Sequence, residues 1–286
     1  MRFGIALGRL NPAFFVDAAL EADRLGYESV WLPEHLVFTT AMSRSPHPGE
    51  AHPPVPPTTP IFDVFAYLGY LAGRTERVRL GTHVYNLGLR HPFIAARGVQ
   101  TLDIVSGGRF EFGIGASWLE EEWAAAELDF RTRGRRVDEA LDVCKRLWTE
   151  DEVAHDGEFF HFDAVAFEPK PVQRPWPPIL VGGESDAALR RAARAGDGWI
   201  GMAHTFESAP RQIERLRALL EENGRSVADR ERFQICLGGP VESPADVARW
   251  EELGVTRLVI SPWRRSPEAV DGVRAFADLV GLEPRG

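Results

Sequence analysis

A histidine and an acidic residue stand together directly after a short apolar segment, as Glu34-His35 after residues 29–33 (SVWLP). The ordinary pKa of an imidazole is ~6.5, so His35 can give or take a proton near neutral pH. A histidine at the end of a strand can also simply pack and cap that strand. If residues 29–33 form a strand of a closed barrel, His35 follows its carboxyl end, where barrel active sites lie. This position favours a catalytic role for His35.

A Gly-x-Gly motif, Gly113-Ile114-Gly115, ends another apolar segment, RFEFGIG. A dinucleotide-binding fingerprint needs a third glycine three residues later, in the first strand-to-helix turn. Trp118 stands at that position, and the segment is the fourth strand candidate, so the fingerprint is absent. Because glycine has no Cβ, the motif could let a flat group approach the backbone. A tight strand-to-helix turn without a ligand explains it equally well.

A second glycine pair precedes a predicted helix in the segment VGGESDAALRR. The free N–H groups at such a helix start can hold a phosphate, so Gly182, Gly183 and Ser185 are candidates for phosphate binding. Glu184 and Asp186 carry the opposite sign to the one a phosphate needs, and Ser-Asp is also an ordinary helix cap.

Other catalytic patterns are missing from the sequence. There is no His-Glu-x-x-His, no P-loop and no Gly-x-Ser-x-Gly, and the histidines have no metal-ligand spacing. Cys144 and Cys236 are far apart, as expected for buried thiols in a reducing compartment. We therefore expect no metal site, no hydrolase chemistry and no catalytic cysteine.

Short apolar segments alternate with amphipathic helical patterns along the whole chain, which predicts a parallel sheet. Eight such units favour a closed TIM-type (β/α)8 barrel, a single domain over residues 1–286, rather than an open doubly wound sheet. The strand candidates are residues 2–7, 29–33, 78–85, 109–115, 177–183, 198–202, 232–239 and 256–262.

Two segments interrupt this alternation. Residues 36–60 hold seven of the 21 prolines and follow the second strand, which favours a lid over the active site. Residues 155–178 precede the fifth strand, and their alternating aromatic residues predict a hairpin insertion that covers one side of the barrel.

Composition narrows the possible partners. The net charge of -9 argues against a general nucleic-acid binder, which needs a basic face. No apolar run approaches the ~20 residues that span a bilayer, so no membrane partner is expected. The N-terminal residues read as a strand rather than as a signal peptide. These features predict a soluble, cytoplasmic protein.

Five segments, taken in order, resemble the bacterial luciferase-like monooxygenase superfamily, most of all its branch of coenzyme F420 (deazaflavin)-dependent oxidoreductases. They are SVWLPEH, RVRLGTHVYNLGLRHP, TLDIVSGGRFEFGIGASWLEEE, RGRRVDEAL with a following LW, and PPILVGGESDAALRRAARAGDGW. The resemblance implies a TIM barrel with a flavin or deazaflavin across its C-terminal mouth, the ring near strands two to four and the phosphate near strands five and six.

The resemblance also implies roles for particular residues. His35 matches the usual catalytic histidine of the deazaflavin branch. His83 and Val84 would back the cofactor ring, joined by a non-proline cis peptide bond. Ala116 stands where relatives that oxidise a sugar phosphate have an acidic glutamate, which makes that reaction doubtful here. Gly113, Gly115 and Ala116 would line the base of the cofactor site, and Trp118 would form one side of the substrate pocket. Glu120, Glu121 and Glu122 are expected to favour a helix start through their charge.

The expected function is F420-dependent hydride transfer between the deazaflavin and a small organic substrate. An FMN-dependent monooxygenase that uses O2 is the first alternative, and a non-catalytic flavin-binding barrel is the second. Relatives often pair through helices near strands two and three, so a homodimer is possible.

Overall fold

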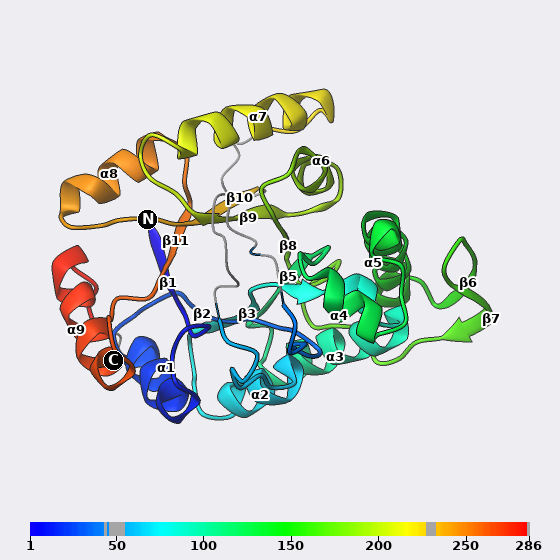
Figure 1. Ribbon diagram of the computed structural model, residues 1–286, viewed down its shortest axis with the longest axis horizontal. Coiled ribbons are helices and arrows are strands. Elements are labelled where there is room, and N and C mark those ends of the chain that lie inside the picture. Colours follow the sequence, from blue (N-terminus) through cyan, green and yellow to red (C-terminus); the bar gives the residue numbers. More distant parts are fainter. Residues whose placement is uncertain (43–44, 46–54, 227–232, 285–286) are drawn as a thin grey trace.

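A closed barrel of parallel strands lies inside a ring of helices (Figure 1). The computed structural model describes residues 1–42, 45, 55–226 and 233–284. Each barrel strand arises from one of the predicted apolar segments. The strands are β1 (Arg2–Ala6), β2 (Ser29–Leu32), β3 (Arg79–Thr82), β4 (Tyr85–Asn86), β5 (Phe110–Gly115), β8 (Ile179–Gly182), β9 (Gly198–Ala203), β10 (Gln234–Gly238) and β11 (Arg257–Ile260).

The strand order confirms the predicted (β/α)8 barrel. Neighbours run β3-β2-β1-β11-β10-β9-β8-β5, and β3 pairs with β5 to close the cylinder. At this seam Leu80 lies opposite Phe110 and Gly81 opposite Glu111. The short β4 continues along β5, so β3 and β4 act as two pieces of one barrel strand.

The helices cover the outer face of the barrel, and their buried residues recur at helical spacing. Pro92 lies at the first position of α3, and the His91 side chain caps this helix by accepting the N–H of Phe93 at 3.2 Å. The helices are α1 (Phe15–Arg24), α2 (Val64–Ala72), α3 (Pro92–Val105), α4 (Glu120–Ala125), α5 (Arg133–Thr149), α6 (Asp186–Ala195), α7 (Ala209–Glu222), α8 (Pro244–Glu252) and α9 (Ala269–Val280). Short 3-10 turns lie at Pro12–Phe14, Leu87–Leu89, Phe130–Thr132 and Ser266–Glu268.

The barrel interior is filled by the indole of Trp31, which is fully buried. A Cβ at Gly81 would overlap this ring, and one at Gly4 would lie 2.9 Å from its Nε1 atom, so small residues on both neighbouring strands make room for it. Other barrel strands add apolar side chains around Trp31, so the interior is a packed core. These side chains are Ala6, Val84, Leu180, Ile200, Cys236 and Val259.

Below Trp31, a buried charged cluster closes the N-terminal end of the barrel. Arg257 has no exposed side-chain surface and donates to both Glu111 oxygens, at 2.6 and 3.0 Å. Its Nη2 atom also contacts Glu28 at 2.6 Å, and Arg79 donates to Glu111 at 2.6 Å. The cluster links β11, β5 and β3 to the residue that precedes β2.

Acid is expected to weaken the barrel through Glu111. Burial alone would raise the pKa of its carboxyl, but Arg257 and Arg79 outweigh burial and hold that pKa at about 2. Since an unfolded glutamate titrates near 4.5, the stabilising contribution is full above that pH and is lost as the pH falls through about 2. Urea unfolding measured down this range should show a falling free energy of unfolding. A Glu111→Leu, Arg257→Met double variant should show a shallower fall, and an unchanged slope would contradict the assignment.

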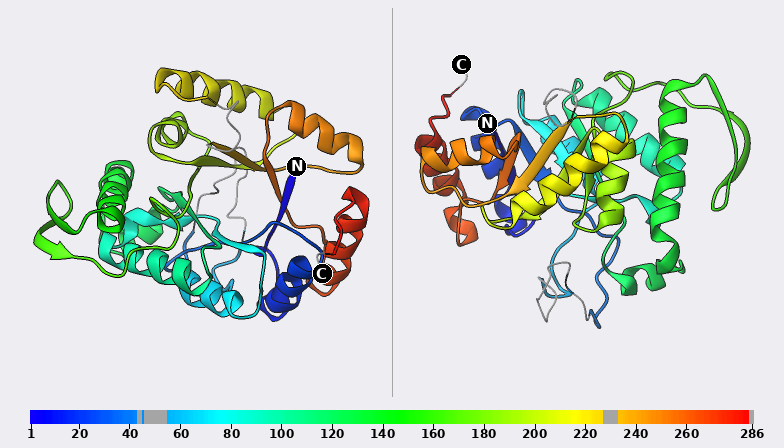
Figure 2. Two further views of the ribbon diagram at one scale, coloured as in Figure 1. Left: turned by 180° about the vertical axis from the view of Figure 1, so that it is seen from behind. Right: turned by 90° about the horizontal axis from the view of Figure 1, so that it is seen from above.

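The insertion before the fifth barrel strand contains a hairpin, as predicted, which projects beyond α5 (Figure 2). Its antiparallel strands are β6 (Glu152–Asp156) and β7 (His161–Ala166), so the hairpin begins three residues earlier than the predicted segment. Two phenylalanines hold it to α3, since the ring of Phe160 lies 5.3 Å from His91 and that of Phe162 lies 4.7 Å from Phe93. Most of the prolines in the predicted lid, 36–60, lie outside the described residues.

In the part of the chain that the structure describes, no helix is both long and apolar enough to cross a membrane.

Candidate functional site

The segment that carries His35 leaves β2 and is anchored through its neighbour Glu34. The buried Glu34 carboxylate pairs with Arg90 and accepts the backbone N–H of Asn86 at 2.9 Å. The Asn86 side chain donates to the Glu34 carbonyl at 3.1 Å, and Arg90 lies 4.7 Å over the ring of Tyr85. These contacts tie the residue before His35 to β4 and the turn that follows it.

The His35 ring lies between two aromatic side chains at the mouth of the barrel. Its centre is 4.7 Å from that of Phe38 and 5.8 Å from that of Trp118. Its Nδ1 atom lies 3.0 Å from a carboxylate oxygen of Glu122, and only 12% of the side chain is exposed. Among the described residues, the Nε2 atom has no polar partner. The structure therefore brings together His35 and Trp118, the two residues that the sequence assigned to catalysis and to the pocket wall.

Glu120, Glu121 and Glu122 lie in the first turn of α4, as predicted, but Glu122 has a further role that the sequence did not reveal. Its side chain is fully buried and binds His35 and the N–H of Leu36, the latter at 2.6 Å. The three consecutive glutamates concealed this difference, because local spacing cannot show which one faces the barrel. The sequence offered one indication of this burial: Glu122 is the third residue of α4 and directly precedes the apolar Trp123.

The peptide bond between His83 and Val84 is cis, as the resemblance implied. This bond lies between β3 and β4, and the Val84 side chain packs with the residues around Trp31. Burial lowers the pKa of His83 to about 4, so this imidazole is neutral at neutral pH. The neutral His83 ring lies beside Trp31, with 6.0 Å between the two ring centres.

The two glycines of the Gly-x-Gly motif have structural reasons to be glycine. A Cβ at Gly113 would overlap the backbone carbonyl oxygen of Thr82, and one at Gly115 would lie 2.5 Å from Val84. The Thr82 hydroxyl also donates to the Gly113 carbonyl at 2.6 Å. The space that these glycines leave is therefore occupied by β3 and by Val84. Contact of Gly113, Gly115 or Ala116 with a cofactor stays a prediction.

Gly182 and Gly183 form the turn from β8 into α6. Gly183 has a φ of +121°, which favours glycine, and its N–H donates to the carbonyl of Ile200 at 3.2 Å. Ser185 is the N-cap of α6, because its hydroxyl accepts the N–H of Ala188 at 3.2 Å. Among the described residues, the N–H groups of the first two helical residues, 186 and 187, have no acceptor. Phosphate binding by Gly182, Gly183 and Ser185 stays a prediction.

The two acidic residues beside this turn are both engaged. Glu184 accepts the N–H of Met202 at 2.6 Å and lies 3.2 Å from His204. Asp186 pairs with Arg215 at 2.6 Å and with Arg190 at 2.7 Å, and these arginines lower its pKa. Their charges therefore do not rule out an anion at the start of α6.

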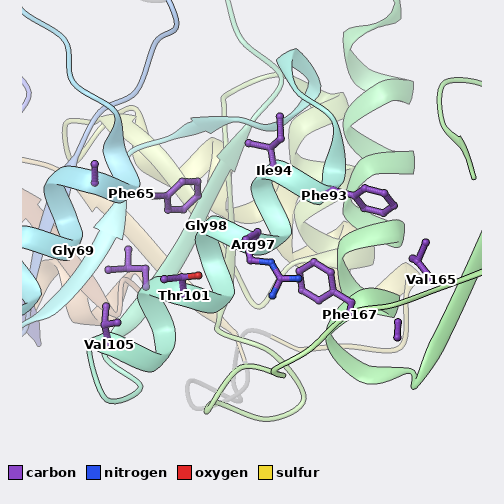
Figure 3. Close-up of a pocket in the computed structure, with 13 residues that line it drawn as sticks. Phe65, Gly69, Phe93, Ile94, Arg97, Gly98, Thr101, Val105, Val165 and Phe167 are labelled. Carbon is purple, nitrogen blue, oxygen red and sulfur yellow. The ribbon is translucent and has the colours of Figure 1, made fainter.

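An apolar groove lies beside α2 and α3, and His35 is not among the residues that line it (Figure 3). In it the guanidinium of Arg97 lies 4.0 Å over the ring of Phe167. The lining comes from α2, α3 and the hairpin and consists of Phe65, Ala66, Gly69, Phe93, Ile94, Arg97, Gly98, Thr101, Leu102, Val105, Val165, Ala166 and Phe167. No group of three or more histidine, cysteine or acidic side chains among the described residues could hold a metal ion.

A family model described as luciferase-like monooxygenase matches residues 1–271. The chain belongs to the luciferase-like monooxygenase family. This match covers both the barrel mouth around His35 and the turn into α6, and it confirms the family that the five sequence segments indicated.

Members of the family that are similar to this chain differ in cofactor. An uncharacterized protein of Mycobacterium tuberculosis is 31% identical over 94% of this chain and 92% of its own length. An F420-dependent glucose-6-phosphate dehydrogenase of Nakamurella multipartita is 28% identical over 98% of this chain and 88% of its own length. An FMNH2-dependent dimethylsulfone monooxygenase of Pseudomonas putida is 33% identical over 48% of this chain and 38% of its own length.

Solved structures of this luciferase-like fold superpose on the chain over almost its whole length. The monooxygenase RslO1 of Streptomyces bottropensis has a TM-score of 0.77 at 23% identity, with 98% of each chain covered. The F420-dependent tetrahydromethanopterin reductase of Methanopyrus kandleri has the same TM-score at 15% identity, again with 98% of each chain covered. At these identities the superpositions establish the fold alone.

Proposed function

We propose that this protein is an F420-dependent oxidoreductase that transfers a hydride between the deazaflavin and a small organic substrate. The observation that carries the proposal is the His35 imidazole at the barrel mouth. Its Nδ1 atom is held by a buried carboxylate, while Nε2 is left without a partner among the described residues. Such an arrangement suits proton transfer beside a hydride acceptor.

The residues at the mouth fit a flat cofactor with an anionic tail. Val84 fills the space above Gly115 and Gly182 and so makes an apolar floor, which would support a ring. The N–H groups at the start of α6 would hold a phosphate. When bound, the reduced deazaflavin supplies the hydride. His35 gives a proton to the substrate atom beside the carbon that accepts hydride, or removes one in the reverse direction.

Three features support F420 and this division of roles. The F420-dependent relative matches 98% of this chain, whereas the FMN-dependent one matches 48%. Ala116 has no titratable group, so a proton has to come from elsewhere, and His35 is suitably placed. Phe38 and Trp118 flank His35 with aromatic surface, which favours an organic substrate with an apolar part over a sugar phosphate.

Equilibrium titration of the apo-protein with F420 and, separately, with FMN tests the cofactor. We expect cofactor fluorescence at fixed salt to show micromolar or tighter binding of F420 and much weaker binding of FMN. Preferential binding of FMN would identify the protein as a monooxygenase instead, with O2 as co-substrate, an alternative that the 33% identity to the dimethylsulfone enzyme supports. If neither cofactor bound below millimolar concentration, the proposal would be wrong.

The proposed partner is therefore a small molecule, with no nucleic acid and no membrane. We also propose that the protein acts in the cytoplasm and that two copies form a homodimer.

A further inference from the structure

The two oxygens of the Glu122 carboxylate contact different parts of the site. Oε2 lies 3.0 Å from His35 Nδ1. Oε1 accepts the backbone N–H of Leu36 at 2.6 Å and that of Val37 at 3.4 Å. Leu36 and Val37 directly follow His35 in the loop after β2. One buried carboxylate thus holds both the imidazole and the backbone that follows it.

For an ionised Glu122, the hydrogen-bonding chemistry determines which imidazole nitrogen carries the proton. An ionised carboxylate has only acceptors, so the contact with Glu122 requires a proton on Nδ1 of His35. In a neutral imidazole the other nitrogen, Nε2, then carries the lone pair. Arg90 pairs with Glu34, and its positive charge also interacts with Glu122.

We propose that Glu122 is a positioning residue that holds the neutral His35 with its proton on Nδ1, and that it also holds the backbone at Leu36 and Val37. Nε2 is then the nitrogen that exchanges a proton with the substrate: it accepts one in the oxidative direction, and in the reductive direction it gives one that it has first taken up from water. The effect on turnover rests on the proposed function. The tautomer itself does not.

A carboxylate is required at this position because its two oxygens can each accept hydrogen bonds. A glutamine has a single amide oxygen, and its NH2 group is a donor. In a Glu122→Gln variant, an oxygen turned to Leu36 places the NH2 group against Nδ1. That contact favours the opposite tautomer, with the proton on Nε2. If the amide is flipped instead, its oxygen keeps the contact with Nδ1–H. Its NH2 group then faces the backbone N–H of Leu36, so two donors oppose each other.

The chain offers a matched control in the pair formed by His155 and Glu139. Glu139 lies 3.1 Å from His155 Nε2 and accepts the backbone N–H groups of Phe159 and Phe160, at 3.1 and 2.9 Å. The chemistry is the same, but this pair holds the β6–β7 hairpin, away from the barrel mouth. Glu139→Gln should therefore disturb the hairpin and leave His35 unchanged.

The test is 15N NMR of protein labelled at histidine, recorded at about pH 8.5, with the His35 signal assigned from its loss in His35→Gln. We expect the Nδ1–H tautomer of His35 to exceed the other by ~10-fold or more in the wild type, because a hydrogen bond to a charged group favours it. In Glu122→Gln this ratio should fall ~10-fold or more, and in Glu139→Gln it should stay the same. Fluorescence titration should show F420 affinity within about threefold of wild type in both variants.

A wild-type His35 with a proton on Nε2, as the other tautomer or as imidazolium, would overturn the proposal even if Glu122→Gln failed to fold. An unchanged tautomer ratio in a folded Glu122→Gln would overturn it as well. If F420 does not bind the wild type, the proposed function fails, but the spectra still decide the role of Glu122. Where F420 does bind, turnover of its reduced form with a panel of small ketones and enones should fall ~10²-fold in Glu122→Gln.

Discussion

Replacing His35 with alanine is expected to lower turnover by about 10²-fold or more, the usual loss when a proton-transferring group is removed. The ring is the titratable group between Phe38 and Trp118 at the barrel mouth, and Ala116 cannot replace it. Binding of F420 should change little, because Val84 and the start of α6 are the elements proposed to hold the cofactor. Steady-state turnover of reduced F420 with small ketones and enones measures the first effect, and fluorescence titration measures the second.

His161→Ala is the matched control for this experiment. His161 is 71% exposed on the hairpin and pairs with Asp156, so its loss should affect neither turnover nor binding. If His35→Ala retained turnover within about threefold of wild type, His35 would not be the catalytic residue. If wild type itself bound F420 but turned over none of the acceptors, the non-catalytic flavin-binding barrel would be the better description.

Gly113→Ala is expected to lower the free energy of unfolding by about 3 kcal/mol or more, at the upper end of what overpacking costs. The new methyl group would overlap the Thr82 carbonyl oxygen and would lie 3.0 Å from Ile200. Because the overlapped atom belongs to the backbone of β3, relief requires β3 and β5 to separate at the seam that closes the barrel. Urea unfolding followed by circular dichroism measures the loss.

Gly69→Ala provides the opposite expectation within the same chain. Gly69 lies inside α2, and a Cβ there would meet no atom within 4 Å. Alanine should therefore raise the free energy of unfolding by about 0.5–1 kcal/mol, since it favours the helix over the unfolded chain. If the free energy of unfolding of Gly113→Ala lay within about 1 kcal/mol of the wild-type value, the tight contact with Thr82 would not explain why this residue is glycine.

The barrel could be predicted from the sequence because each strand and helix has its own local pattern. Apolar runs such as ILVG and amphipathic helices such as α5 are recognisable within a few residues. The location of His35 followed from one further rule, that barrel sites lie at the carboxyl ends of strands. The family motifs added two predictions: that Trp118 lies at the substrate pocket and that the His83-Val84 peptide bond is cis.

The contacts that complete the site could not be predicted, because they join residues far apart in the chain. Glu122 is 87 positions from His35, and nothing near it in sequence distinguishes it from Glu120. The need for glycine at position 113 likewise depends on Thr82, 31 residues earlier. Local charge correctly indicated a helix start, but only tertiary packing shows which glutamate contacts His35. Likewise, only packing shows that a Cβ at Gly113 would overlap Thr82.

During evolution, residues 111 and 257 are expected to change together rather than one at a time. Loss of Glu111 leaves the buried Arg257 with Glu28 alone, and loss of Arg257 leaves the buried Glu111 with Arg79 alone. Either change costs up to about 3–5 kcal/mol, against a typical total stability of about 5–15 kcal/mol. A double exchange for apolar residues of similar volume carries no such cost. Across lineages, we therefore expect these two positions to be inherited either as an acid with an arginine or as two apolar residues, with mixed pairs rare.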